Sequence, residues 1–326
     1  MVVFYGETMK IVLSDEQKRK LKILEPRLDR AISEQNLKFA KEIVAELQSI
    51  LRPTQHFVRL VQSKNKLCEL AIELGQLDSI LKILESNIQV LQTKTRIYIE
   101  TISLIAIYHL RLKDVEKAKK YIKEVLENYD VIKTERTRRI FHSEIIDRFN
   151  QEVAIATLTG FHDFTIDQDE VEREAIRIIQ TLTDDEIYEK IGKLSPQSTK
   201  DLIYVVHDYS LKQLPFTQRA MLPSPDQKVK DKEVGLTVYE AVKRVLYNSM
   251  CNPESEIYKA WYTNGLQFFL NKKYILTTVV GSLTTLGFGA TMVVASLVAL
   301  ITKFGIEVYC EKNKPLYISQ IRKVVE

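Results

Sequence analysis

Between about Ser14 and Asn128, apolar residues recur at every third or fourth position and are interrupted by short polar breaks. This spacing is typical of amphipathic helices, which bury one face and expose the other. Three similar stretches begin at Asn36, Gln76 and Leu112, and each follows another apolar stretch. The pattern therefore predicts a series of helix pairs.

The three predicted helix pairs are spaced almost evenly along the chain. If Ala40, Ile80 and Ala118 hold equivalent positions, the spacings between them are 40 and 38 residues. A period in this range is typical of a solenoid, in which one pair cannot bury its apolar face without its neighbours. An irregular helical bundle with accidental periodicity is the alternative.

The alternation of large and small packing residues in these pairs resembles the tetratricopeptide family. The third pair carries the pattern in Ile105, Ala106, His109, Ala118, Ile122 and Val125, and the second pair in Leu67, Cys68, Ala71, Gly75 and Leu84. The period exceeds the family's usual length of about 34 residues, and Ile80 stands where the family prefers alanine. The resemblance implies helical hairpins and, by analogy, the binding of a protein or peptide partner.

A basic cluster opens the next helical run, from Thr134 to Thr159, and consists of Arg136, Arg138 and Arg139. Such a cluster can hold an anion or an acidic partner segment. The alternative, which the nearby acidic residues favour, is a solvated helix face with internal ion pairs.

The acidic stretch 167–214 contains three helix starts, at Asp167, at Asp184 or Asp185, and at Ser195 followed by Pro196. Residues 215–232 contain three prolines and little apolar periodicity, which predicts a linker. We therefore expect a helical-repeat scaffold over 1–214 and a C-terminal helical domain over 233–326.

The C-terminal part contains a segment without charge, from Tyr274 to Thr302, in a chain of which 28% of the residues are charged. About 20 apolar residues suffice to cross a bilayer core, so the segment is long enough to be a transmembrane helix. Small residues recur at every fourth position in Gly281, Thr285 and Gly289, and again in Ala295 and Ala299. Because small residues allow helices to approach closely in lipid, we expect homo-oligomerisation through this segment.

Two glycines, Gly287 and Gly289, divide the apolar segment into two arms of about 20 Å each, shorter than a bilayer core of about 30 Å. A broken segment would therefore be a membrane-inserting hairpin or part of a soluble core, whereas an unbroken helix could cross the membrane. Side chains typical of a membrane interface precede it, in Trp261, Tyr262, Lys272 and Lys273. The alternative for Trp261 is a place in the core of the C-terminal domain.

Composition favours an all-α fold, because there are only 10 glycines and 8 prolines, the residues that are costly inside helices. The net charge of +4 comes from interspersed acidic and basic residues, which does not favour nucleic-acid binding. The three cysteines show no metal-site spacing and fit a reducing compartment. With no secretory signal at the N-terminus, we expect a cytoplasmic bulk with membrane association through the C-terminal segment.

Catalytic signatures of nucleotide-binding proteins, hydrolases and proteases do not occur in the sequence, which favours a non-enzyme without a cofactor. Two dipeptides, His162-Asp163 and His207-Asp208, suggest a metal-dependent hydrolase as an alternative. The leading hypothesis is a scaffold that recognises a protein partner and is attached to a membrane, or inserts into it conditionally as a membrane-perturbing effector. A soluble adaptor with the apolar segment in its core is the second hypothesis.

Overall fold

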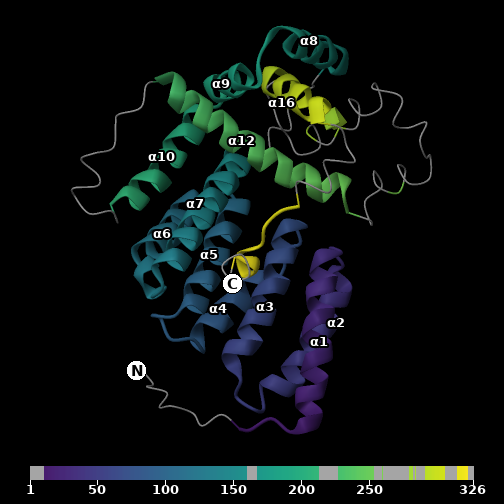
Figure 1. The fold of residues 1–326 in the computed structure, drawn as a ribbon, viewed down its shortest axis with the longest axis vertical. Coiled ribbons are helices and arrows are strands. Elements are labelled where there is room, and N and C mark those ends of the chain that lie inside the picture. The colour runs from purple at the N-terminus through teal and green to yellow at the C-terminus, as the bar shows by residue number, and fades with distance from the viewer. Residues whose placement is uncertain are drawn as a thin grey trace.

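The computed structural model describes residues 11–159, 167–212, 227–252, 259, 279–281, 283, 291–304 and 314–321. All regular elements within these ranges are helices, so the prediction of an all-α fold is confirmed. The N-terminal helices are α1 (Asp15–Ser33), α2 (Leu37–Leu51), α3 (Phe57–Glu73), α4 (Ile80–Gln89), α5 (Arg96–Arg111) and α6 (Val115–Glu127). They pack as the pairs α1–α2, α3–α4 and α5–α6, and neighbouring pairs are in contact (Figure 1).

The turn inside each pair has the same backbone geometry. Gln35, Gly75 and Lys113 take the left-handed conformation, with φ of 55°, 70° and 60°. In each turn, this residue's N–H bonds to the carbonyl three residues earlier, and the next N–H bonds to the carbonyl five residues before it. These are the two hydrogen bonds of the Schellman motif, which ends a helix and satisfies its last carbonyls. The three turns are 40 and 38 residues apart, the same spacings that the apolar pattern predicts.

The remaining described helices are α7 (Glu135–Leu158), α8 (Gln168–Thr181), α9 (Asp184–Leu194), α10 (Gln197–Leu211), α12 (Gln227–Met250) and α16 (Thr291–Phe304), with short 3-10 turns η1 (Tyr129–Val131) and η2 (Ile318–Gln320). The predicted start at Asp167 is confirmed, because its side chain accepts the N–H groups of Asp169 and Glu170. Helix α10 begins one residue later than predicted, so that Pro196 precedes the helix.

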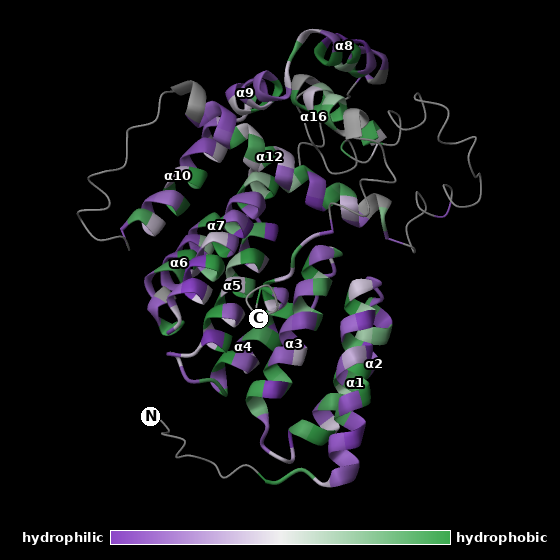
Figure 2. Cartoon of the chain, viewed as in Figure 1, coloured by the Kyte–Doolittle hydropathy of each residue, from purple (hydrophilic) through white to green (hydrophobic). Residues whose placement is uncertain are grey.

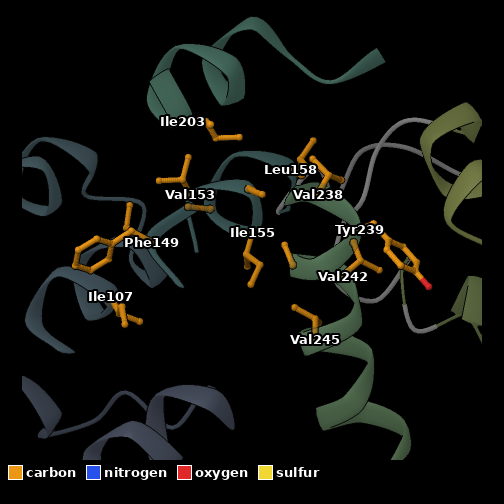
Figure 3. Packing of buried hydrophobic residues seen from close by; sticks show 14 of the residues in the cluster. Ile107, Phe149, Val153, Ile155, Leu158, Ile203, Val238, Tyr239, Val242 and Val245 are labelled. Carbon is orange, nitrogen blue, oxygen red and sulfur yellow. The ribbon is translucent and has the colours of Figure 1, made fainter. Parts of the chain in front are cut away.

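Two hydrophobic clusters form the interior. The smaller joins α1, α2 and α3, and the larger extends from α3 through α7 and α12 to α16. Figure 3 shows Val238, Val242 and Val245 of α12 opposite Ile155 and Leu158 of α7, all within the larger cluster. Burying such side chains is the main source of stability in a fold of this kind.

The predicted linker is partly helical, because residues 227–232 form the beginning of α12. Asp231 in this stretch is buried, and its carboxylate lies 3.0 Å from the Lys200 ammonium of α10. Residues 215–226 lie outside the described residues, and the division of the chain into two domains stays a prediction.

Helices α9 and α12 cross with their backbones in contact at two glycines. A Cβ atom placed on Gly192 would lie 1.7 Å from the Asp231 carbonyl oxygen, and one placed on Gly235 would lie 1.8 Å from the Tyr188 carbonyl oxygen. Only glycine leaves room for so close an approach.

The apolar segment is described over residues 279–281, 283 and 291–302. In α16, residues 293–300 are buried, Ala295 and Ala299 among them, and the helix packs against α8 and α9. Figure 2 colours α16 white and green, whereas α8 and α9 each combine hydrophilic and hydrophobic stretches. Among the described residues, no helix is both long enough and apolar enough to cross a membrane. Among the described residues, a Cβ on Gly281 would meet no atom within 4 Å. Helix association at this position stays a prediction.

Candidate functional site

Six charged side chains meet inside the helical array. They form what we call the central charge cluster, which consists of Glu69 and Glu73 from α3, Arg111 from α5, Arg148 and Glu152 from α7, and Arg244 from α12. All are buried except Arg111, which is partly buried. Charged residues rarely occupy such positions unless they are paired.

Glu73 contacts all three arginines of the cluster. Its carboxylate oxygens lie 2.5 Å from Arg148 Nη2, 2.8 Å from Arg244 Nε and 3.5 Å from Arg111 Nη2. Glu152 completes the cluster with bonds to Arg111, at 2.5 Å and 3.0 Å, and to Arg148 at 2.9 Å. Four helices, α3, α5, α7 and α12, are therefore held together by one group of ion pairs.

Glu69 differs from the other two carboxyls of the cluster. Burial raises its pKa to about 8, while the positive charge of Arg148 and a hydrogen bond from the Ile318 N–H act in the opposite direction. At neutral pH, Glu69 is therefore mostly protonated, and three guanidinium groups share two carboxylates. The cluster then carries one net positive charge.

Residues 314–321, which we call the C-terminal segment, lie beside α3, the helix that carries Glu69 and Glu73 (Figure 1). The Ile318 N–H donates to Glu69 Oε1 at 2.8 Å, and Arg244 Nη2 donates to the Leu316 carbonyl at 2.9 Å. At the start of the segment, Lys314 Nζ donates to Ser33 Oγ at 2.5 Å. The segment is thus bound partly through its main chain and partly through one lysine.

Asn248 of α12 connects the same site to the first helix pair. Its amide donates to the Glu73 carbonyl at 3.2 Å and to Glu73 Oε2 at 3.0 Å, and its Oδ1 accepts from Gln35 at 2.8 Å. Gln35 is the left-handed residue of the first repeated turn. The site therefore contacts at least one residue of each N-terminal helix pair, namely Gln35, Glu73 and Arg111.

A pocket of about 210 Å³ lies beside the C-terminal segment, between α7 and α12. Its lining includes Arg148 and Arg244 of the cluster, the exposed Asp147, the partly buried Lys243, and Leu316 of the segment. Within the described residues, Arg148 Nε and Nη1 have no hydrogen-bond partner, although the side chain is only 4% exposed. The site thus retains unused donors next to an open pocket.

In the wild-type chain, the free energy of unfolding should fall as the pH rises, because Glu69 loses its proton. A Glu69→Gln variant should not show this fall. The pKa of Glu69 is about 8 in the folded chain against an ordinary value of 4.5, so folding takes up a proton between these two values. The contribution of this group is fully present below the ordinary pKa and is lost as the pH rises through the folded pKa.

Urea unfolding of both proteins at about pH 5, 7 and 9 tests this, because the difference between them isolates Glu69 from other titrating groups. The side chain of glutamine keeps an oxygen that can accept the Ile318 N–H. A difference in unfolding free energy that does not change with pH would contradict the assignment.

The residues predicted as an anion or partner site lie elsewhere, at the start of α7. Arg136 and Arg139 are exposed, and Arg139 Nη2 lies 2.5 Å from Glu135 Oε1. An exposed ion pair between residues four positions apart, as seen at Arg139, is what the alternative of a solvated helix face predicts. Partner binding at Arg136, Arg138 and Arg139 stays a prediction.

The predicted membrane residues fall mostly outside the described ranges. The interface residues Trp261, Tyr262, Lys272 and Lys273 lie outside them, as do Tyr274, Thr285, Gly287 and Gly289 of the apolar segment. Thr302 belongs to α16.

The His-Asp dipeptides are only partly described, since His162 and Asp163 lie outside the described residues. His207 and Asp208 are exposed on α10, and Asp208 Oδ2 lies 2.6 Å from Lys212 Nζ. No group of three or more potential metal ligands occurs in the part of the chain that the structure describes.

The cysteines add no reactive site among the described residues. Burial raises the pKa of the Cys68 thiol to about 12, which disfavours the thiolate needed for catalysis. Cys251 is disulfide-bonded. The reducing compartment that the sequence suggested stays a prediction.

Sequence reasoning missed the central charge cluster. A signal was available, because Glu69 and Glu73 stand four residues apart within an apolar stretch, and Arg148 and Glu152 have the same spacing. Residues at this spacing share one helix face. No protein-family model, curated protein or solved structure matches this chain.

Proposed function

We propose that the chain is a non-enzymatic scaffold that binds a partner protein through the surface around the central charge cluster. The helix pairs, with their three equivalent turns at spacings of 40 and 38 residues, support a repeat architecture of the tetratricopeptide kind. Such architectures present an extended surface on which a partner segment can lie.

One observation carries the proposal: a stretch of polypeptide already lies on this surface. Two main-chain hydrogen bonds hold the C-terminal segment there: Arg244 donates to a carbonyl of the segment, and an N–H of the segment donates to Glu69. Buried side chains of the segment add to the contact. Main-chain bonds combined with apolar side-chain contacts are the usual means by which proteins recognise extended peptides.

Site-specific photo-crosslinking in cells that express the chain tests the proposal. The photoreactive residue p-benzoylphenylalanine replaces Asp147, which is exposed and lines the pocket beside the C-terminal segment, or Lys41, an exposed residue of α2. We expect a defined protein adduct from position 147 and none from position 41. Adducts that form equally at both positions, or only at position 41, would exclude this surface as the partner site.

Conditional membrane attachment is a second candidate function, and α16 favours it. The helix has no charged residue before Lys303, and residues 293–300 are buried against α8 and α9. The apolar segment would therefore have to leave this packing before it could reach lipid or mediate homo-oligomerisation. The alternative is a soluble adaptor in which α16 stays in the core. Flotation of the full chain with anionic liposomes, with and without the crosslinked partner, distinguishes membrane attachment from the soluble adaptor. Attachment predicts that the chain floats with the liposomes in at least one of the two conditions, and the adaptor predicts that it floats in neither.

A further inference from the structure

The C-terminal segment resembles a bound peptide more than a packed element of the fold. Up to Tyr317 it belongs to no helix, and Tyr317 itself is extended, with φ of −83° and ψ of 147°. It then forms the single turn of η2, which contacts α3. Its hydrogen bonds to Glu69 and Arg244 use N–H groups and a carbonyl of its main chain, which any peptide could supply.

The side chains of the segment fill two separate apolar sites. Tyr317 belongs to the cluster of α1, α2 and α3, whereas Ile318 and Ile321 belong to the larger cluster, and each of the three is only 2% exposed. The segment thus lies where the two clusters meet. Its ring and two branched aliphatic side chains define what this surface accepts: an aromatic residue followed directly by an aliphatic one, with another aliphatic residue three positions later.

The surroundings leave room for a ligand longer or more polar than the segment. The pocket of about 210 Å³ is lined by Lys314, Pro315 and Leu316 on one side and by α7 and α12 on the other. Arg148, whose Nε and Nη1 have no hydrogen-bond partner among the described residues, borders it. Because Arg148 lines the pocket, its positive charge would attract a peptide carbonyl or carboxylate that entered it.

We infer that residues 314–321 are an internal ligand in the partner site, and that the partner supplies an extended peptide with the same aromatic–aliphatic pattern, which displaces them. This inference rests on the proposed function and specifies its ligand. The external peptide makes the same main-chain bonds to Glu69 and Arg244, and its side chains take the places of Tyr317, Ile318 and Ile321. Because the internal segment is always present at high effective concentration, it weakens binding of any external peptide.

A fluorescent synthetic peptide, KPLYISQI, tests the inference by anisotropy with the full-length chain. The native chain is compared with a Tyr317→Ala, Ile318→Ala double variant, in which the internal ligand is weakened. The control is Ser319→Ala, which alters a neighbouring side chain that is only partly buried. We expect the double variant to bind the peptide at least about ten-fold more tightly than the native chain and the control.

A second peptide, N-methylated at the amide that corresponds to Ile318, lacks the N–H that Glu69 accepts. It should bind the double variant at least about ten-fold more weakly than the unmodified peptide. If the double variant does not fold, as judged by circular dichroism, hydrogen exchange of the native chain replaces it. Excess unlabelled peptide should then speed the exchange of amides in residues 314–321.

Equal affinity of the peptide for the native chain and the folded double variant would overturn the inference while leaving peptide binding intact. Absence of binding to every variant, with unchanged exchange of residues 314–321, would also overturn it. In that case the crosslinking from position 147 still decides independently whether this surface binds a protein.

Discussion

Replacing Gly235 with alanine should destabilise the fold by more than about 3 kcal/mol, above the usual range for overpacking. The new Cβ would lie 1.8 Å from the Tyr188 carbonyl oxygen, and this oxygen belongs to the backbone of α9. A backbone atom cannot rotate away as a side chain can, so α9 and α12 would have to separate. That separation would disturb the larger cluster, to which both helices contribute Ile187, Ile191, Val238 and Val242.

Gly281→Ala is the matched control for this prediction. Gly281 is also helical, but a Cβ there would meet no atom of the described part of the chain within 4 Å. Alanine should therefore leave stability unchanged or raise it by up to about 1 kcal/mol, through its better helix propensity. Chemical denaturation of the three proteins measures the difference. If Gly235→Ala is as stable as Gly281→Ala, the close crossing of α9 and α12 does not exist in solution.

Glu73→Gln should lower the free energy of unfolding by about 3–5 kcal/mol, the range observed when one partner of a buried ion pair is removed. Glutamine keeps the size of the side chain, so the loss reflects charge rather than a cavity. The variant leaves Arg111, Arg148 and Arg244 without the carboxylate that contacts all three of them. The substitution thus removes one negative charge from among the three guanidinium groups.

Two further variants separate this effect from a general loss of charge. Glu135→Gln removes the carboxylate of the exposed pair with Arg139, which should cost less than about 1 kcal/mol. Adding Arg148→Met to Glu73→Gln removes the positive charge that Glu73 would have balanced and should recover part of the lost stability, as a double-mutant cycle would show. If Glu73→Gln costs no more than Glu135→Gln, the buried cluster does not contribute to folding as described.

The helix pairs could be predicted because the information for them is local. Apolar residues at every third or fourth position specify a buried helix face wherever the partner helix lies. The repeat spacing was also readable, and the turns at Gln35, Gly75 and Lys113 repeat at the same intervals. The predicted linker, 215–232, includes the first six residues of α12. The start of this helix is polar and has no apolar periodicity, so the pattern gave no sign of it. Its contact with the rest of the fold is a buried ion pair between Asp231 and Lys200.

The central charge cluster could not be predicted with the same reasoning. Charged side chains are normally assigned to the surface, because burying one without a partner is costly. Glu73 and Glu152 are buried only because arginines from three helices converge on them, and the order of residues along the chain does not show that convergence. The contact of Ile318 with Glu69 joins residues 249 positions apart.

The sequence by itself determined the helical class, the paired helices with their spacing, and the presence of one exceptionally apolar stretch. Each of these depends on residues within a few turns of one another. Only the tertiary structure decided which charges are paired in the interior, that residues 293–300 of α16 pack against α8 and α9, and that the C-terminal segment lies at the meeting point of the two hydrophobic clusters. An apolar helix can be buried equally well by lipid or by protein, and an extended segment gains its hydrogen bonds from whatever surface it meets. The local pattern is the same for each of these alternatives, so only long-range packing determines which one occurs.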